Sequence, residues 1–228
     1  MLKHHSKITL TRRTALKIGV LTTASLVIGV SPLQKFQATS VQAAGNTESS
    51  PKQLGFSHNQ NTCIGCRSCE YACKKLYKWE EGVKWRTVYT QTTEDKPKPF
   101  FLSMSCNHCA DPACLKVCPV GAYTKREKDG IVVHDSSRCV GCGYCLYACP
   151  YHAPQFGKTS GAVSKCSFCY QRQDNGENPA CVDACPTKAL KFGDVEELKK
   201  QEGAVFQISG MPTPKITNPS LVIIPKKG

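Results

Sequence analysis

The sequence predicts an α+β fold organised around bound metal clusters, and three observations carry this prediction. All 16 cysteines of the 228-residue chain fall into four groups of four. Short stretches of strand composition and of helix composition lie between and beside these groups. The hydrophobic content of 40% is modest for this length. Metal–thiolate bonds can replace part of a small apolar core, because metal binding contributes its free energy to folding.

The third cysteine group predicts the type of cluster. It has the spacing C-x2-C-x2-C-x3-C-P and consists of Cys139, Cys142, Cys145 and Cys149, followed by Pro150. In this motif the first three thiolates hold one 4Fe-4S cluster, and the fourth is turned toward a second cluster. The motif therefore predicts a partner group elsewhere in the chain.

Three further groups have related spacings. The first contains Cys63, Cys66, Cys69 and Cys73, and Lys74 stands in the place of the proline. The second contains Cys106, Cys109, Cys114 and Cys118, followed by Pro119. The fourth contains Cys166, Cys169, Cys181 and Cys185, followed by Pro186. Together they predict four 4Fe-4S clusters in two ferredoxin-like units, but the spacing does not say which groups exchange their fourth cysteines.

The segments around the groups predict the elements of the fold in chain order. Residues 44–62 are expected to form a flexible lead, and residues 63–193 the four-cluster domain. A short helix over 70–79 is followed by an inserted pair of strands at 83–90 and 100–104, joined by a polar turn. Residues 130–134 form another strand after the Asp129-Gly130 turn. The stretches after Pro119 and Pro186 are expected to share one local structure.

Residues 194–228 predict a surface helix followed by an extended tail. Asp194 is a candidate N-cap, with Glu197 completing a capping box and Gly203 ending a helix over 195–202. The apolar run 221–224 is too short to cross a membrane. It is expected to lie along this protein or a partner subunit.

Residues 1–43 predict a twin-arginine signal peptide. Thr11-Arg12-Arg13 precedes an apolar run over 18–30, and Val41-Gln42-Ala43 offers a cleavage site with a small residue. The run is shorter than the roughly 20 residues that a membrane-spanning helix needs. The predicted location is therefore the periplasm or the outer face of the cytoplasmic membrane, reached in the folded state with clusters already inserted.

Three other readings of the composition are disfavoured. A disulfide framework would suit an exported chain with an even number of cysteines, but the x2 spacings place the thiols too close for ordinary bridges. Zinc binds paired C-x2-C groups, yet the spacing that ends in Cys-Pro is more specific to 4Fe-4S clusters. The net charge of +13 includes six basic residues of the signal peptide, and four clusters of about −2 each offset the remainder, which disfavours nucleic-acid binding.

From Cys63 onward the chain resembles the four-cluster electron-transfer subunit of molybdenum oxidoreductases, in particular that of dimethyl sulfoxide reductase. The matching stretches are Ser103-Met-Ser-Cys-Asn-His-Cys-Ala-Asp-Pro-Ala-Cys, Lys116-Val-Cys-Pro, Ala148-Cys-Pro-Tyr-His-Ala-Pro-Gln, Lys165-Cys-Ser-Phe-Cys and Asn218-Pro-Ser-Leu-Val-Ile-Ile-Pro. The resemblance is specific because these stretches include residues that are not ligands.

The resemblance implies that the outer groups pair with each other and the inner groups pair with each other. Cluster 1 would be held by Cys63, Cys66, Cys69 and Cys185, and cluster 2 by Cys73, Cys166, Cys169 and Cys181. Cluster 3 would be held by Cys106, Cys109, Cys114 and Cys149, and cluster 4 by Cys118, Cys139, Cys142 and Cys145. Nitrate reductase relatives have Trp at the third cysteine of the third group and hold a 3Fe-4S cluster there, so Cys145 implies a 4Fe-4S cluster.

The expected function is electron transfer without substrate chemistry of its own. The resemblance implies a molybdopterin catalytic subunit and a quinone-linked membrane subunit as partners in an anaerobic respiratory oxidoreductase. The electron-transfer subunit of dimethyl sulfoxide reductase commonly lacks its own leader, and in having one this chain is similar to the iron–sulfur subunits associated with tetrathionate reductase and with the cytochrome c nitrite reductase pathway. This departure leaves open these substrates, polysulfide, or a free periplasmic polyferredoxin. Lys74, Lys75 and Lys165 are candidates for tuning cluster potentials, and His108 is expected beside a cluster as a hydrogen-bonded residue.

Overall fold

The computed structural model describes residues 52–93 and 96–227, and these described residues belong to one compact unit. The predicted signal peptide and the lead up to residue 51 lie outside the described residues. The helices are α2 (Ser68–Tyr77), α3 (Ala113–Lys116), α4 (Tyr144–Ala148), α5 (Tyr170–Asp174), α6 (Ala180–Asp183), α7 (Val195–Leu198) and the 3-10 helix η1 (Pro214–Ile216). The strands are β1 (Leu54–Asn59), β2 (Arg86–Thr93), β3 (Lys96–Ser105), β4 (Tyr123–Lys125), β5 (Val132–His134), β6 (Gln155–Phe156), β7 (Val163–Ser164), β8 (Leu190–Asp194) and β9 (Leu221–Ile224).

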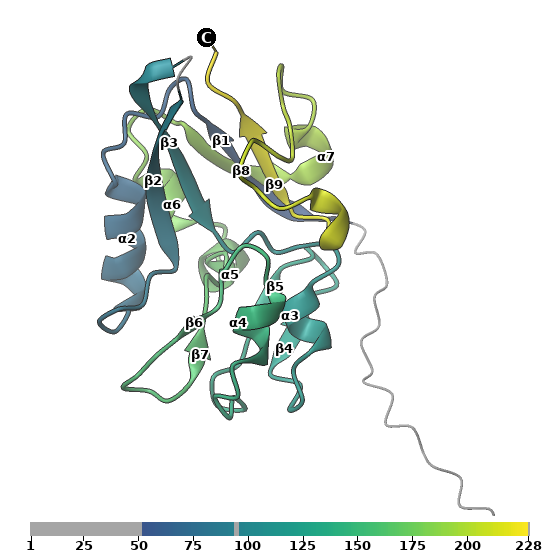
Figure 1. The fold of residues 1–228 in the computed structure, drawn as a ribbon. Helices are drawn as coiled ribbons and strands as arrows, with labels where there is room; N and C mark the ends of the chain where they lie inside the picture. The colour runs from purple at the N-terminus through teal and green to yellow at the C-terminus, as the bar shows by residue number, and fades with distance from the viewer. Residues whose placement is uncertain (1–51, 94–95, 228) are drawn as a thin grey trace, which may run out of the picture. The chain divides into compact units, whose positions relative to one another are not determined.

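The largest sheet joins the two ends of the described chain. Its strand order is β8-β1-β9, with β1 antiparallel to β8 and parallel to β9 (Figure 1). Phe56 in the middle strand lies opposite both Phe192 and Leu221. This corrects one expectation, because residues 54–59 belong to a central strand instead of a flexible lead. Residues 221–224 lie along this protein, one of the two places expected for them, as a strand of the same sheet. Residues 54–59 form a strand because they are buried, with a neighbouring strand on each side.

The predicted insert is a hairpin of β2 and β3. The pairing runs from Arg86 opposite Ser105 to Thr93 opposite Lys96, with an irregularity between Gln91 and Thr93. The hairpin is therefore confirmed, but its strands are longer and its turn is shorter than the polar stretch 92–99 suggested. In Figure 1 it lies beside α2.

Two pairs of short helices accompany two sets of strands. Helix α2 packs on α6 near the sheet of β1 and β8, while α3 packs on α4 near the β4–β5 hairpin (Figure 1). The strand predicted at 130–134 is confirmed as β5. One group of buried apolar side chains surrounds Phe56 and Phe168, and a second, smaller group surrounds Tyr123 and Val163. The mixed helix and strand content that the sequence predicts is thus present.

The predicted surface helix is shorter than expected. Helix α7 ends at Leu198, and the following amide groups of Lys200 and Gln201 bond to carbonyls three residues earlier, as in a tightened last turn. Asp194 is the N-cap, but its carboxylate accepts from the amide of Glu196 at 2.8 Å, and Glu197 pairs with Lys200. Within residues 52–93 and 96–227, no helix has the length and apolar character to span a membrane.

Candidate iron–sulfur cluster sites

Each cysteine group contains the same backbone bend immediately before its second cysteine. The residues at that position all have a positive φ: Gly65 (70°), His108 (42°), Gly141 (68°) and Phe168 (59°). A left-handed residue turns the chain sharply. In the two inner groups, both cysteines that flank the bend line the same cavity.

Two of these bends use bulky residues, although the left-handed conformation costs a non-glycine residue roughly 1–2 kcal/mol. The side chains of His108 and Phe168 are fully buried and meet edge to face, with ring centroids 5.0 Å apart. Phe168 also packs on Phe56, with centroids 4.1 Å apart. Core packing therefore offsets the backbone cost.

His108 is buried instead of lying at the surface. Its Nδ1 accepts a hydrogen bond from the amide of Val132 at 3.1 Å. Burial, with the nearby charges of Lys165 and Arg86, lowers the pKa of His108 well below its ordinary value. The imidazole is therefore neutral and supports the fold next to two ligand cysteines.

A second repeated turn follows the Cys-Pro pairs. The third residue after the cysteine has a positive φ at Gly121, His152 and Lys188. In each case its amide donates back to the carbonyl of the cysteine, at 3.3, 3.1 and 3.2 Å. The shared local structure predicted after Pro119 and Pro186 is confirmed, and it also occurs after Pro150.

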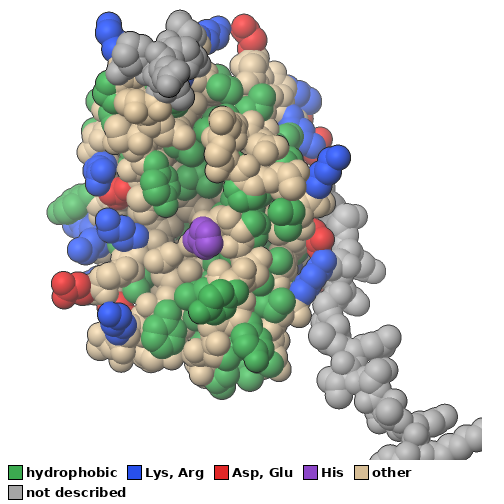
Figure 2. Space-filling view, viewed as in Figure 1, with side chains coloured by type: hydrophobic (Ala, Val, Ile, Leu, Met, Phe, Trp, Pro, Cys, Tyr) green, Lys and Arg blue, Asp and Glu red, His purple; other side chains and the backbone are tan. Residues whose placement is uncertain are grey.

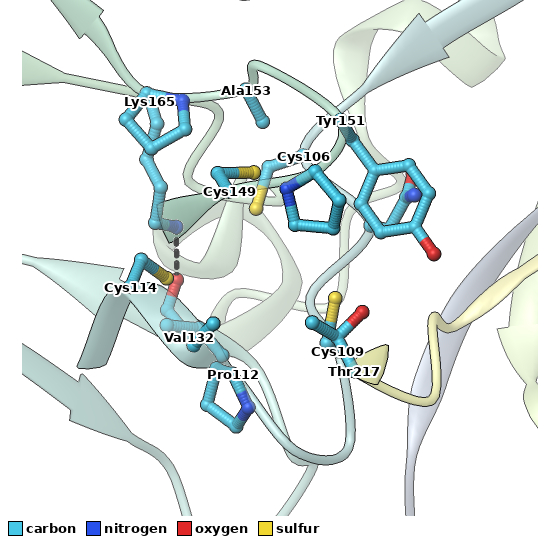
Figure 3. A pocket seen from close by; sticks show the side chains of 14 residues that line it. Cys106, Cys109, Pro112, Cys114, Val132, Cys149, Tyr151, Ala153, Lys165 and Thr217 are labelled. Atoms are coloured by element: carbon cyan, nitrogen blue, oxygen red, sulfur yellow. Dashed lines mark hydrogen bonds between the residues drawn. The ribbon is translucent and has the colours of Figure 1, made fainter. Parts of the chain in front are cut away.

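One inner cavity is lined by cysteines from the second and third groups. They are Cys106, Cys109, Cys114 and Cys149, the set that the resemblance implies for cluster 3 (Figure 3). Cys114 lies on α3, and Cys149 is the C-cap of α4. Burial and the neighbouring thiol of Cys106 raise the pKa of Cys109 to about 12.

The second inner cavity contains the complementary set. Its cysteines are Cys118, Cys139, Cys142 and Cys145. The amide of Ala122 donates to Cys118 Sγ at 3.2 Å, and the amide of Val163 donates to Cys139 Sγ at 3.4 Å. Amide groups that donate to sulfur stabilise negative charge on a thiolate.

The outer groups also come together, because α2 packs on α6. Burial raises the pKa of Cys63, and the thiols of Cys69, Cys185 and Cys66 add to the shift. Burial likewise raises the pKa of Cys73, whose neighbouring thiols are Cys166, Cys181 and Cys169. These neighbours are the sets that the resemblance implies for clusters 1 and 2.

The chemistry of the four sets fits 4Fe-4S clusters. Thiolate sulfur is the ligand that such clusters take, one cysteine to each iron atom. Within residues 52–93 and 96–227, no three His, Cys, Asp or Glu side chains converge closely enough to hold a single metal ion. A 4Fe-4S site does not need that convergence, because its four thiolates bind four different iron atoms.

Exposure differs between the sets. Cys66 in the first group and Cys142 in the third are exposed, whereas Cys106 and Cys181 are buried. Figure 2 shows hydrophobic side chains gathered over the lower part of one face, and Lys and Arg mainly along its margins. Exposed hydrophobic residues next to Cys142 are Val140, Tyr144 and Tyr147.

The three candidate lysines lie in different environments. Lys74 and Lys75 are exposed at the end of α2, where water screens their charge. Lys165 is buried, lines the inner cavity of Figure 3, and donates from Nζ to the carbonyls of Val132 and Cys166. Only Lys165 places an ammonium group in a dry position beside ligand thiols.

Sequence reasoning missed Arg86, which is buried on β2. Burial acts to lower its pKa, but the thiolates of Cys181, Cys69 and Cys166 act more strongly together and raise it. A signal was present in the sequence. Residues two apart in a strand share a face, so Arg86 lies on the same face as the buried Val88.

Comparisons with known proteins indicate iron–sulfur binding. A family profile described as 4Fe-4S dicluster domain matches residues 97–195, and one described as 4Fe-4S binding domain matches residues 60–79. The B subunit of anaerobic dimethyl sulfoxide reductase from Escherichia coli is 43% identical over 183 residues, which cover 76% of this chain and 89% of the relative. The B subunit of polysulfide reductase from Wolinella succinogenes is 38% identical, covering 77% and 96%. The thiosulfate reductase electron transfer subunit of Salmonella typhi is 42% identical, covering 63% and 77%.

Proposed function

We propose a function from one premise: this chain belongs to the family of iron–sulfur subunits that includes the B subunit of anaerobic dimethyl sulfoxide reductase. The proposed role is to carry four 4Fe-4S clusters and relay electrons inside an anaerobic respiratory oxidoreductase. The observation that carries it is the division of all 16 cysteines into four sequence groups, and eight of these cysteines line two cavities with four cysteines each. The clusters, when bound, supply one-electron donor and acceptor sites.

The proposed ligand sets combine outer groups with each other and inner groups with each other. Set 1 is Cys63, Cys66, Cys69 and Cys185, and set 2 is Cys73, Cys166, Cys169 and Cys181. Set 3 is Cys106, Cys109, Cys114 and Cys149, and set 4 is Cys118, Cys139, Cys142 and Cys145. The common lining of the two inner cavities supports sets 3 and 4, and the mutual influence of the outer thiols supports sets 1 and 2.

Two of the sets are suited to exchange electrons with other subunits. Cys66 and Cys142 are exposed, and exposed apolar side chains stand beside each, Ile64 and Val140 among them. Apolar residues that protrude around a redox site favour docking of a partner. The proposed partners are a molybdopterin catalytic subunit and a quinone-linked membrane subunit, and this chain has no catalytic step of its own.

The substrate of the complex has a second candidate class. The resemblance favours dimethyl sulfoxide, but relatives at 38–42% identity are named for polysulfide and thiosulfate. A reductase of polysulfide or thiosulfate is therefore the alternative.

The protein is also proposed to be exported by the twin-arginine route. Lysine keeps the charge of arginine but lacks its planar, five-donor guanidinium. Arg12→Lys with Arg13→Lys should leave the iron-loaded protein in the cytoplasm, as fractionation and an antibody would detect. An unchanged periplasmic level in the double variant would contradict export by this route.

The deciding experiment is purification from anaerobically grown native cells, with iron and molybdenum counted in the same sample. About sixteen iron atoms per chain together with molybdenum and a large partner is the expected result. About sixteen iron atoms with no partner would indicate a free periplasmic polyferredoxin instead. Zinc in place of iron would remove the electron-transfer proposal altogether.

A further inference from the structure

Arg86 is a buried positive charge for which the described residues provide no acidic partner. Its side chain is 2% exposed. Nη1 donates to Ser103 Oγ and Nη2 to Ser105 Oγ, both at 2.9 Å. The guanidinium carbon lies 4.6 Å from the ring centroid of Phe56. Hydroxyl groups and a ring face do not neutralise a charge, and a buried charge without an opposite charge costs several kcal/mol.

The groups near Arg86 that would become anionic on cluster binding are cysteine thiols of two different proposed ligand sets. Ser103 Oγ lies 3.5 Å from Cys69 Sγ, so one hydroxyl touches both the guanidinium and a ligand of set 1. Cys181, Cys166 and Cys73, all of set 2, also interact with the charge of Arg86. Phe56, on which the guanidinium stacks, packs in the same buried group as Cys166 and Cys181 of set 2, and Cys69 of set 1 packs against that group. The guanidinium therefore lies near both outer sites.

We propose that Arg86 is a positioning residue whose single positive charge is shared by the two outer cluster sites and raises the reduction potentials of both. This inference rests on the proposed function, because it requires clusters in sets 1 and 2. Reduction adds one electron from the donor subunit to a site and makes it more negative. A fixed cation in a medium of low dielectric constant favours that change, and Arg86 stays protonated throughout.

The first test replaces Arg86 in the complete complex and measures potentials. Arg86→Gln retains hydrogen-bond donors but removes the charge. Two of the four midpoint potentials, followed by EPR during a redox titration, should fall by at least about 59 mV, which is a tenfold change in a one-electron equilibrium. The other two should move less. Lys74→Gln is the matched control, because it removes an exposed positive charge directly beside Cys73, and it should shift each potential less than Arg86→Gln does.

A second variant separates charge from packing. Arg86→Lys keeps the charge but loses the paired contact with the two serines. The one-electron reduction equilibria of its outer clusters should therefore stay within a few-fold of the wild-type values. If Arg86→Gln loses iron from the outer sites, full iron loading and wild-type potentials in Arg86→Lys still support the proposal. Equal falls in both variants, loss of iron from both, or unchanged potentials in Arg86→Gln would overturn it.

The same samples show whether a negative result concerns the role of Arg86 alone or the proposed function as a whole. Wild-type protein with four EPR-detectable clusters and an unmoved Arg86→Gln variant contradicts only the role of Arg86. Wild-type protein without four clusters contradicts the premise itself.

Discussion

At the scale of single residues, ligand geometry here depends on backbone conformations that ordinary side chains avoid. His108 and Phe168 occupy the bend that Gly65 and Gly141 occupy in the other groups. The glycines have no side chain to strain, whereas His108 and Phe168 compensate through buried ring contacts. Two groups thus form the bend with a glycine, which tolerates this conformation, and two form it with a bulky residue that core packing keeps in place.

Gly141 provides a direct test of whether such a bend needs glycine because another part of the backbone lies close to it. A Cβ atom at this position would lie 2.4 Å from the carbonyl oxygen of Gly161. Gly141→Ala should therefore lower the iron content and weaken resistance to urea, measured as the bleaching midpoint of visible absorbance. Gly161→Ala is the control, since it has a similar φ of +65° but open space around the Cβ position. Equal losses in the two variants would show that backbone strain alone is responsible.

Lys165 provides a test of electrostatic tuning at set 3. Lys165→Gln should lower the potential of that site by about 59 mV, a tenfold change in the one-electron equilibrium, because a buried ammonium is lost beside its thiols. The EPR titration that measures this should show a smaller change for Lys116→Gln. Lys116 is exposed and paired with Asp111, so solvent already screens it. An unchanged titration in Lys165→Gln would contradict the idea.

At the scale of elements, the strand β9 supports a sheet formed far earlier in the chain. Ile223 pairs with His58 of β1, and its amide and carbonyl both bond to Val205 at 2.8 Å. Its side chain is 0% exposed. The last strand therefore contributes directly to the core around Phe56.

Ile223→Ala should destabilise the protein by about 2–5 kcal/mol, the usual cost of this truncation in a core. The measurement is the shift of the urea midpoint for loss of cluster absorbance and of circular dichroism. Ile216→Ala is the control, because Ile216 is 52% exposed and should change stability by no more than about 0.5 kcal/mol. A shift as small as that of the control would mean that β9 adds little to the sheet.

The sequence predicted local elements better than long-range pairings, for a physical reason. The β2–β3 hairpin and β5 follow from residues close in the chain. The pairing of Phe56 with Leu221 depends on contacts that no local pattern records. The cysteine sets were predicted from the spacing and from the resemblance, because a 4Fe-4S cluster takes cysteine thiolates as its ligands. Arg86 was missed because basic residues are rarely buried, and only the thiolates around it make its burial tolerable.

At the scale of the whole molecule, cysteines and hydrophobic residues share the same cores. Cys106, Cys166 and Cys181 belong to the buried group around Phe56, and Cys114 and Cys145 to the group around Tyr123. Burial raises the thiol pKa values of Cys109 and Cys181 to about 12. These two thiols are therefore protonated near neutral pH in the iron-free chain, and binding of a metal cluster to them would release their protons.

Removal of iron should consequently unfold much of the protein. Chelation of iron under reducing conditions should collapse the near-ultraviolet circular dichroism and greatly speed amide hydrogen exchange in α2, α3, α4 and α6. The physical reason is that a site formed only in the folded state contributes its binding free energy to folding. Protection factors that stay unchanged after complete iron loss would contradict this expectation.

The parallel pairing of β1 with β9 has a consequence for biosynthesis. A ribosome makes β1 well before β9, and at about 5–20 residues per second the interval between them is on the order of 10–30 s. During that time one edge of β1 has no partner. The sheet closes only after β9 has been translated, so a chain that terminates before β9 leaves this edge of β1 open.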